Sequence, residues 1–569
     1  MERATKTAIK KLVLDLRHLL EEDIEVVLKR YGLFTNREWL AEARIPKADA
    51  QLLADRARMA AAIEVEMARG IKRGEATRWY IREVAFTYLN RLVGLKCLEV
   101  RGLMDEVITT RVEYGGRSQF HRDFRHEYPQ LAAKADDALP DMLEAACRIV
   151  TDEMIGVLFD PDSESSVVWP RYPALRRAIE LINGLPAEVW AEDEIIGWIY
   201  QFYNAEEKEK IRKRGKPKLP IEVAVINQFF TPRWVVKYLV DNTLGRLWLE
   251  MYPDSARVRA KCNYLVPEPL PAPDGPESDE NTFTPDPNSP INNPQAPARR
   301  QPKPVTEIRL IDPACGAMHF GYYAFEVFQA MYRDARERGW PIWSVDYTNR
   351  QPVLPPPTDA EIPALILAHN LYGVDIDLRA VQLAALALYM KARVAEREAD
   401  PQHRAQYRVN LVCADARLTN GGLRERFLAQ YKDDPKLQQV WRELFTEMED
   451  IAQVGSLLRP EERLRQLLDD YRPSTIELET ERQPGLPGVP QKPRQMTLAE
   501  APGGEQWTPR RTLSQMVKNL HRFAKNALVE ADVNAQMFAV EVKKAVSLLE
   551  ILTQVYDVVV MNPPYGTST

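Results

Sequence analysis

The stretch Tyr556-Asp-Val-Val-Val-Met-Asn-Pro-Pro-Tyr565 predicts a buried strand that runs directly into a stiff turn. Val558 to Met561 form a short apolar run, and β-branched residues favour the pleated backbone. The two prolines fix φ and lack N–H donors, so the turn presents carbonyl acceptors. Asn562 adds an amide and Tyr565 a flat ring, which together suit a planar, amine-bearing ring such as adenine. An ordinary strand followed by a Pro-Pro turn explains the same residues, so the choice depends on the rest of the chain.

Upstream of this stretch, predicted strands alternate with predicted helices, a pattern typical of a parallel sheet. Residues 306–311 read as a strand that ends in Asp312-Pro-Ala-Cys-Gly-Ala-Met-His-Phe320, and residues 322–338 read as the helix that follows. A loop that leaves a strand and enters a helix lets backbone groups approach a ligand at the helix N-terminus. We therefore expect a ligand-binding loop here.

Acidic residues also follow the next two predicted strands. A single acidic residue after a strand is explained equally well by a helix N-cap. Asp312, Asp375 and Asp415 come in order, each at a carboxyl strand end, and this repetition favours a binding site. The other predicted elements are strands over residues 370–374, 408–413 and 555–561 and a helix over residues 378–397.

The first 220 residues predict a mainly helical region. Apolar residues recur at helical spacing over residues 1–30, 48–71, 77–94 and 193–203. The apolar face of residues 77–94 is interpreted as core packing rather than as a cofactor site. Arg78, Trp79, Tyr80 and Arg82 mix cations with aromatic rings, a composition that fits nucleic acid but also an exposed helix start.

Residues 208–218 contain seven cations among eleven residues. Such a run could follow phosphates, although most charged runs are simply solvated. Glu206, Glu207 and Lys208 lie downstream of Asp193 and superficially match a metal-dependent nuclease pattern. That chemistry needs carboxylates on neighbouring strands, and because this segment reads as a helix we reject the nuclease hypothesis.

Two segments rich in helix breakers divide the chain. Twelve of the 42 prolines lie between Pro267 and Pro304, and a second such stretch spans residues 473–509. We expect both to be extended or disordered insertions, because they cannot bury enough apolar surface to offset the entropy of ordering. The predicted parts are a helical region (1–220), a helical segment (221–265), a Pro-rich linker (266–304), three strands of a sheet (305–420), a helical and Pro-rich insertion (421–550) and a fourth strand (551–569).

Composition limits the function classes. The net charge of −6 provides no global basic field, so contacts to nucleic acid need local patches. None of the five cysteines forms a CxxC pair, so neither a zinc site nor a disulfide framework is indicated. We find no signal peptide and no apolar run of membrane-spanning length, and we expect a soluble cytoplasmic protein without a bound metal.

The ordered motifs together resemble the amino-methylating DNA methyltransferases that use S-adenosylmethionine. They are Asp312-Pro-Ala-Cys-Gly, Tyr372-Gly-Val-Asp-Ile-Asp, Ala414-Asp-Ala and Asn562-Pro-Pro-Tyr. Asn227-Gln-Phe-Phe-Thr-Pro-Arg-Trp is similar to the motif that these enzymes place before the first strand, which corresponds to the gamma arrangement of N6-adenine enzymes. The resemblance implies a Rossmann-like methyltransferase sheet preceded by a mainly α-helical region.

The resemblance extends to the PglX family, the large methyltransferases of BREX phage-defence systems, and to the DISARM and type IIG methyltransferases. It is carried by Gly197-Trp-Ile-Tyr-Gln-Phe-Tyr203, by residues 230–248 and by residues 370–384, and it covers roughly residues 77–565 apart from the insertions. It implies transfer of a methyl group to the N6 amino group of adenine in double-stranded DNA, with the target base flipped out of the duplex.

The resemblance also implies roles for individual residues. Asp375, with Ile376, would hold the ribose hydroxyls of the cofactor, and Asp415 would accept a hydrogen bond from its adenine. The methionine end would lie among Thr231, Pro232, Asp312, Pro313, Ala314, Cys315 and Gly316. Asn562 and the Pro563 carbonyl would accept hydrogen bonds from the target amino group, with Pro564 stiffening the turn and Tyr565 stacking on the base.

Two departures from the family pattern modify these expectations. Ala317 and Met318 follow Gly316 where the family usually continues Ser-Gly, so we expect either an obstructed cofactor loop or backbone strain at Met318. The chain also stops four residues after Tyr565, before the further strands and the target-recognition region of the family. We therefore expect an incomplete sheet in a fragment, a relic or a split enzyme that awaits a partner chain or other defence proteins. A non-catalytic binding module and an RNA or protein glutamine methyltransferase remain alternative hypotheses.

Overall fold

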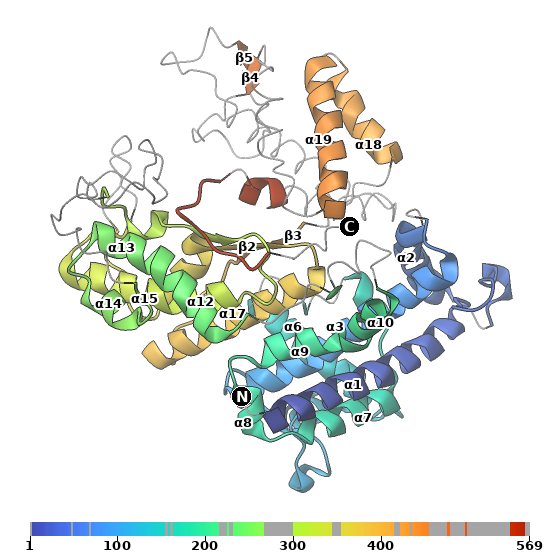
Figure 1. The fold of residues 1–569 in the computed structure, drawn as a ribbon. Coiled ribbons are helices and arrows are strands. Elements are labelled where there is room, and N and C mark those ends of the chain that lie inside the picture. Colours follow the sequence, from blue (N-terminus) through green and yellow to red (C-terminus); the bar gives the residue numbers. More distant parts are fainter. Residues whose placement is uncertain are drawn as a thin grey trace, which may run out of the picture.

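The computed structural model describes most of the chain and shows a mixed α/β fold with predominantly helical content (Figure 1). The helices surround one parallel sheet of four strands. The described residues are 3–46, 49–67, 70–153, 158–159, 163–215, 225–226, 231–266, 300–343, 354–414, 421–432, 435–454, 475–477, 495–497, 547–552 and 554–563.

The four strands lie in the order β3-β2-β1-β6, and every neighbouring pair is parallel. In this register Asp312 lies opposite Gly373, and Asp375 lies opposite Cys413. The strand order changes direction between β1 and β6, the position where open α/β sheets bind their ligands. The strands are β1 (Leu310–Asp312), β2 (Leu371–Asp375), β3 (Asn410–Cys413) and β6 (Val558–Val559).

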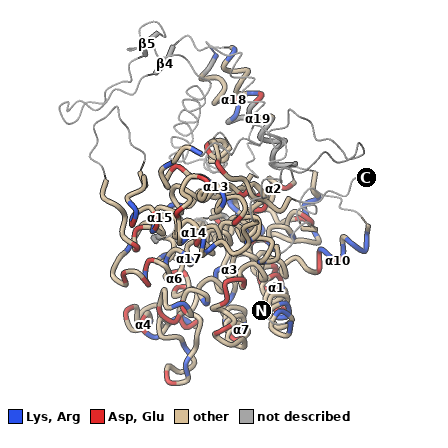
Figure 2. Tube along the Cα trace, turned by 60° about the vertical axis from the view of Figure 1, so that its left-hand side comes forward, with Lys and Arg blue, Asp and Glu red and all other residues tan. Residues whose placement is uncertain are grey.

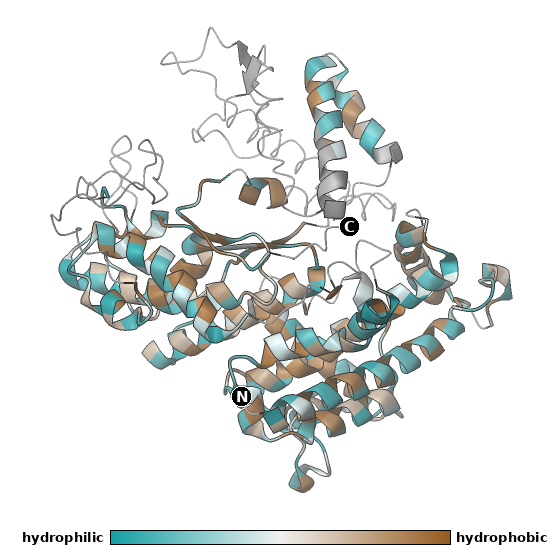
Figure 3. Ribbon diagram, in the orientation of Figure 1, coloured by the Kyte–Doolittle hydropathy of each residue, from teal (hydrophilic) through white to brown (hydrophobic). Residues whose placement is uncertain are grey.

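Alternate residues of the strands point to opposite faces of the sheet, as the two-residue period of a strand requires. Leu310 and Leu371 belong to the large core beneath α15 (His319–Arg338) and α17 (Leu378–Ala399). A smaller apolar cluster lies on the other face. It contains Ile311, Tyr372, Val374, Val412 and Ala414 from the sheet and Leu548 and Ile551 from the helical residues 547–552. Figure 3 draws this short helix mainly in brown beside the sheet.

The N-terminal helices pack against α17 and share its hydrophobic core. Gly94 lies where one of these helices crosses α17, and a Cβ there would lie 3.0 Å from Leu386 Cδ2, so a larger residue would push the helices apart. The N-terminal helices are α1 (Arg3–Arg30), α2 (Ala50–Met67), α3 (Arg73–Val100), α4 (Gln119–Glu127), α5 (Pro129–Ala132), α6 (Leu139–Glu153), α7 (Tyr172–Asn183), α8 (Ala187–Ala191), α9 (Ile195–Tyr203) and α10 (Ala205–Arg214).

Three predicted strands are shorter than expected. Strand β3 begins at Asn410, whose side-chain amide donates to the Leu367 and Ala368 carbonyls, instead of at residue 408. Residues 305–307 form a 3₁₀ helix instead of the start of β1, because Thr306 bonds through both its N–H and its Oγ1 to the Ile342 carbonyl. Asn370 fixes the same turn by donating to the Val305 and Ile308 carbonyls. Strand β6 begins only at Val558, because the Asp557 carboxylate accepts a hydrogen bond from the Arg309 N–H at 3.1 Å in place of regular strand pairing; it ends at Val559.

The remaining described elements include a separate two-stranded sheet of β4 and β5, drawn apart from the four-stranded sheet in Figure 1. Within the residues described, no helix combines the length and apolar character needed to cross a bilayer. The helix α10 forms much of the predicted basic run and ends in Lys and Arg, the blue stretch at its label in Figure 2. The other elements are α12 (Arg233–Val240), α13 (Arg246–Met251), α14 (Ala256–Lys261), α16 (Ile362–Leu365), α18 (Gly421–Leu428), α19 (Pro435–Val454), β4 (Thr475–Glu477) and β5 (Gln495–Thr497).

Candidate functional site at the carboxyl edge of the sheet

The loop after β1 is fastened to the end of β2. The Cys315 N–H donates to the Val374 carbonyl at 2.9 Å, and the Gly316 N–H donates to Asp375 Oδ2 at 2.8 Å. These two bonds bring Asp312–Gly316 and Asp375, which lie about sixty positions apart in the sequence, to one edge of the sheet. The predicted juxtaposition of these residues is therefore present in the fold.

Asp375 keeps acceptor capacity for a ligand. Its carboxylate is half-buried and accepts from the backbone N–H of Gly316 and from that of Asp377, the latter at 2.8 Å, and a backbone hydrogen bond from Ile376 also acts on it. A carboxylate has about four lone-pair sites, so three backbone bonds still leave an acceptor position free. Burial, which outweighs the hydrogen bond from Asp377, raises the pKa of Asp375 to about 6. At neutral pH this side chain is mostly ionised and can accept hydroxyl hydrogen bonds.

Asp377, two residues further along, has a different environment. It caps α17 by accepting from the Arg379 N–H at 3.0 Å, and it is only 4% exposed. The Arg379 guanidinium donates Nε to Asp377 Oδ1 at 2.8 Å and Nη2 to Oδ2 at 3.0 Å. Tyr200 Oη donates to the same carboxylate at 3.1 Å. Asp377 is therefore occupied by protein groups, whereas Asp375 is open to a ligand.

Asp312 lies beneath the loop rather than in the open site. It is 1% exposed and accepts the Ala314 N–H at 3.1 Å. Burial is the main cause that raises the pKa of Asp312 to about 8; the bond from Ala314 opposes this shift and the charge of Asp375 adds to it. A carboxyl group with this pKa is largely protonated at neutral pH, which favours a loop-shaping role for Asp312.

Met318 does not obstruct the loop. Its φ of 61° is in the left-handed region, as expected for a strained position, but its side chain is fully buried. The methionine packs where Gly321 and Gly373 lack side chains: a Cβ on Gly373 would lie 3.1 Å from Met318 Sδ, and one on Gly321 would lie 2.8 Å from Met318 Cγ. The backbone strain is present, and the side chain fills the core below the loop.

Asn562 and Thr231 meet at the same edge. Asn562 Nδ2 donates to Thr231 Oγ1 at 3.2 Å, across 331 positions of sequence. The Val560 N–H bonds to the Ile311 carbonyl at 3.0 Å and thereby sets Asn562 and Pro563 beyond the end of β1. Pro232 precedes the first turn of α12, which holds Thr231 in place. Thr231 and Pro232 therefore lie beside Asn562 and Pro563 at this edge of the sheet.

A cavity of about 60 Å³ lies beside Thr231, between helices α9, α12 and α15. Its wall combines acidic and aromatic side chains with His319. Burial lowers the pKa of His319 to about 4, so the imidazole is neutral at pH 7. The lining residues include Asp193, Glu194, Thr231, Ala317, His319 and Tyr322. The cavity extends the site from the loop toward the N-terminal helices.

Three predicted site residues, Asp415, Pro564 and Tyr565, lie outside the described residues. Ala414, the residue before Asp415, is described. Its N–H donates to the Asp375 carbonyl at 2.7 Å, so the end of β3 lies at the same edge of the sheet as Asp375. Pro313, Ala314 and Ile376 lie in the two loops already described and are half-buried.

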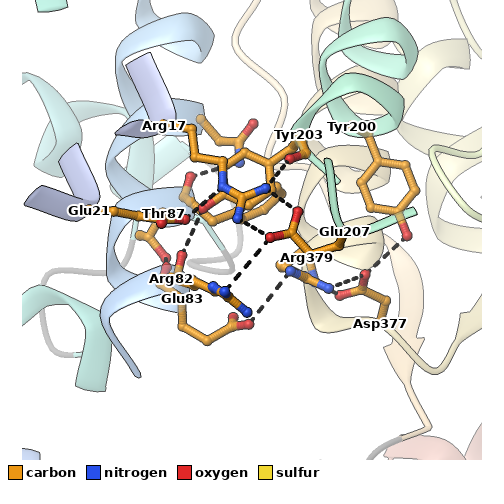
Figure 4. A network of polar contacts seen from close by, with 12 residues as sticks. Arg17, Glu21, Arg82, Glu83, Thr87, Tyr200, Tyr203, Glu207, Asp377 and Arg379 are labelled. Atoms are coloured by element: carbon orange, nitrogen blue, oxygen red, sulfur yellow. Dashed lines mark hydrogen bonds and ion pairs between the residues drawn. The ribbon is translucent and has the colours of Figure 1, made fainter. Parts of the chain in front are cut away.

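Tyr200, Asp377 and Arg379 form a buried polar network that the motifs did not predict (Figure 4). The network continues through Glu83, whose carboxylate lies 3.8 Å from the Arg379 guanidinium. The sequence does point to Tyr200, because this residue lies in the stretch 197–203 that carries part of the family resemblance. The resemblance by itself gives no role to that stretch. Glu207 pairs with Arg17 in this network and lies on helix α10, so the segment is helical as predicted and not a strand.

Comparison with known proteins identifies the relatives of this chain. Residues 369–569 match the family described as Eco57I restriction-modification methylase. An alignment of 509 positions, which covers 85% of this chain, shows 27% identity to the adenine-specific methyltransferase BrxX of Escherichia coli O9:H4 (strain HS) and covers 36% of BrxX. An alignment of 371 positions, which covers 58% of this chain, shows 27% identity to the adenine-specific methyltransferase PglX of Lacticaseibacillus casei (strain Zhang) and covers 27% of PglX.

These matches confirm the predicted resemblance to the PglX family of methyltransferases. The matched part spans about a third of the length of the curated relatives.

Proposed function

We propose that this chain carries the cofactor-binding and adenine-facing parts of a DNA methyltransferase that modifies the N6 amino group of adenine in a BREX-type defence system. The hydrogen bond between Asn562 and Thr231 is the observation that carries the proposal, because it joins the two motifs that such an enzyme needs on either side of its reacting atoms. The matches to BrxX and PglX, both named adenine-specific methyltransferases, support the same function.

Thr231 determines which atom of the Asn562 amide faces the substrate. Because Nδ2 donates to Thr231 Oγ1, Oδ1 is left as an acceptor. Asn562 Oδ1 and the Pro563 carbonyl would then accept the two N–H groups of a flipped adenine. Two acceptors in that position hold the amino group so that its lone pair points toward the methyl donor, and catalysis rests mainly on this positioning.

The residues at the edge of β1 and β2 fit S-adenosylmethionine. Asp375 offers an open acceptor position to ribose hydroxyls, while the loop Asp312–Gly316 and Thr231 border the space for the methionine end. When bound, S-adenosylmethionine would supply a methyl group on a sulfonium sulfur: the adenine amino nitrogen would bond to the methyl carbon as the carbon–sulfur bond breaks, S-adenosylhomocysteine would leave, and the nitrogen would release one proton. We assign the sheet to the Rossmann-like methyltransferase type. The cofactor would lie at the carboxyl ends of the strands, where the strand order reverses between β1 and β6.

The substrate is double-stranded DNA with the target adenine turned out of the helix, since its amino group is otherwise engaged in base pairing. Tyr565 would stack on the extruded ring, a contact worth about 1–3 kcal/mol. Pro564 would keep the turn stiff, and Asp415 would bond the adenine of the cofactor.

The proposal is tested by incubating the chain with methyl-labelled S-adenosylmethionine and, in parallel reactions, with unmethylated duplex DNA, RNA or protein, followed by mass spectrometry of the nucleosides and of the digested protein. We expect N6-methyladenine with the wild-type chain and none with Asn562→Ala. We also expect both proteins to bind S-adenosylhomocysteine equally in calorimetry, because Asn562 faces the base. Label found only in RNA or protein would overturn the DNA assignment, and absence of cofactor binding would overturn the methyltransferase assignment.

A further inference from the structure

We propose that Tyr200 and Arg379 are positioning residues for the cofactor, acting through Asp377 on the Asp375 carboxylate, so that the N-terminal helices form part of the cofactor site. This inference rests on the proposed function, because it takes Asp375 as the residue that binds the ribose hydroxyls.

Asp377 connects the Asp375 carboxylate with the side chains of Tyr200 and Arg379. Its backbone N–H donates to Asp375 Oδ1 at 2.8 Å, and its side chain receives bonds from Arg379 and Tyr200. A backbone group can hold the Asp375 carboxylate in one orientation only when its own residue is fixed. Arg379 alone fixes the plane of the Asp377 carboxylate, since it donates to both oxygens in a fork.

Tyr200 adds a constraint that comes from outside the sheet. It lies on α9, and its hydroxyl donates to Asp377 Oδ2 at 3.1 Å, so the loop after β2 is held against the N-terminal helices. Both partners are buried: Tyr200 is 8% exposed and Asp377 4% exposed. Water therefore cannot readily replace the hydroxyl if it is removed, and the loop loses a defined contact.

Further contacts anchor Arg379 on the side away from the sheet (Figure 4). The Arg379 guanidinium lies over the Phe86 ring at 5.4 Å and close to Glu83, both on α3. Helix α3 through Arg379 and helix α9 through Tyr200 thus support a contact that ends at the carboxylate proposed to bind the ribose.

The experiment compares two substitutions of the same kind on the same helix. Tyr200→Phe removes the hydroxyl that reaches Asp377. Tyr203→Phe removes a hydroxyl that donates to the Arg82 carbonyl at 3.0 Å and has no bond to the cofactor loops. In calorimetry with S-adenosylhomocysteine we expect Tyr200→Phe to lose about 3- to 10-fold in affinity, the range of one ordinary hydrogen bond, and Tyr203→Phe to match the wild type.

Two further measurements separate positioning from general stability. An analogue of S-adenosylhomocysteine without the 2′- and 3′-hydroxyls should bind wild-type and Tyr200→Phe proteins equally, since it lacks the groups that Asp375 holds. Tyr200→Phe should also cause no additional loss in an Asp375→Asn background. If Tyr200→Phe fails to fold, Arg379→Lys is the second variant, because lysine keeps the charge but cannot bridge both Asp377 oxygens.

The outcomes distinguish the inference from the function on which it rests. Unchanged affinity in Tyr200→Phe, or an equal loss for both ligands, would overturn the positioning role while leaving the proposed function intact. An equal loss in Tyr203→Phe would also overturn it. A wild-type chain that does not bind S-adenosylhomocysteine would overturn the proposed function itself and the inference with it.

Discussion

Asn562 donates its side-chain amide to Thr231 Oγ1 at 3.2 Å, although 331 positions separate the two residues. The bond joins the turn after the last described strand to Thr231, which lies two positions before α12. It also leaves the amide oxygen of Asn562 available to a substrate.

Thr231→Val should therefore weaken catalysis more than binding. Valine keeps the shape but cannot hold the Asn562 amide, so we expect the rate of DNA methylation to fall about 3- to 10-fold, as for one lost hydrogen bond. Affinity for S-adenosylhomocysteine should change little. The control is Thr243→Val, whose hydroxyl donates to the Leu239 carbonyl away from the site. Equal rates for wild type and Thr231→Val in a single-turnover assay would contradict the assigned orientation.

Asp375→Asn should weaken cofactor binding strongly. An amide offers one acceptor oxygen and a competing N–H₂ group, whereas hydrogen bonds to a charged acceptor contribute about 1.5–3 kcal/mol, equivalent to roughly 10- to 150-fold in affinity. Calorimetry with S-adenosylhomocysteine measures this loss. Asp359→Asn is the matched control, because Asp359 forms surface ion pairs with Arg333 and Arg336. A wild-type affinity in Asp375→Asn would exclude Asp375 as the ribose ligand.

Asp312 should make the ligand-free protein less stable as pH rises. Its pKa is raised from 3.8 to about 8 in the folded state, so between these values the native state keeps a proton that the unfolded chain has released. The free energy of unfolding then falls with pH by at most about 1.4 kcal/mol per pH unit, and this contribution levels off above pH 8.

The isosteric variant Asp312→Asn isolates this contribution. Asparagine resembles the protonated carboxyl group but does not titrate, so the difference in stability between variant and wild type should shift in favour of the variant from pH 5 to pH 8. Urea unfolding of both proteins at several pH values measures the difference. A difference that does not change with pH would show that Asp312 does not retain its proton in the fold.

At position 318, glycine should be better tolerated than alanine. Both variants lose the buried methionine side chain, at a cost of about 2–5 kcal/mol for a core Met→Ala change. Alanine keeps the left-handed strain at φ 61°, whereas glycine relieves about 1–2 kcal/mol of it. We therefore expect the stability order wild type, Met318→Gly, Met318→Ala in urea unfolding. A more stable Met318→Ala protein would contradict the left-handed geometry.

Met318 also offers a test of where its side chain points. Because this side chain packs near Gly321 and Gly373 inside the core, folded Met318→Gly protein should bind S-adenosylhomocysteine with nearly wild-type affinity. A large gain in affinity would indicate that the methionine obstructs the loop.

Much of the sheet could be predicted from local patterns. Apolar runs followed by Asp312 and Asp375 located two strands and their carboxyl ends, since a buried strand and the loop after it leave a local signature. The lengths of β1 and β6 were predicted less well. Thr306 and Asp557 lie in segments with strand-like composition, but their hydrogen bonds go to Ile342 and Arg309, partners that no local pattern reveals.

The sequence by itself determined the kind of site, because its motifs specify which chemical groups follow which strand. Only the tertiary structure decided how those groups are oriented. The motif resemblance already pointed to Asp375, but only the fold shows that contacts with Tyr200 and Arg379 occupy Asp377 while Asp375 faces the open edge of the sheet. The Tyr200 contact joins residues 177 positions apart, so it exists only once the N-terminal helices have packed against α17.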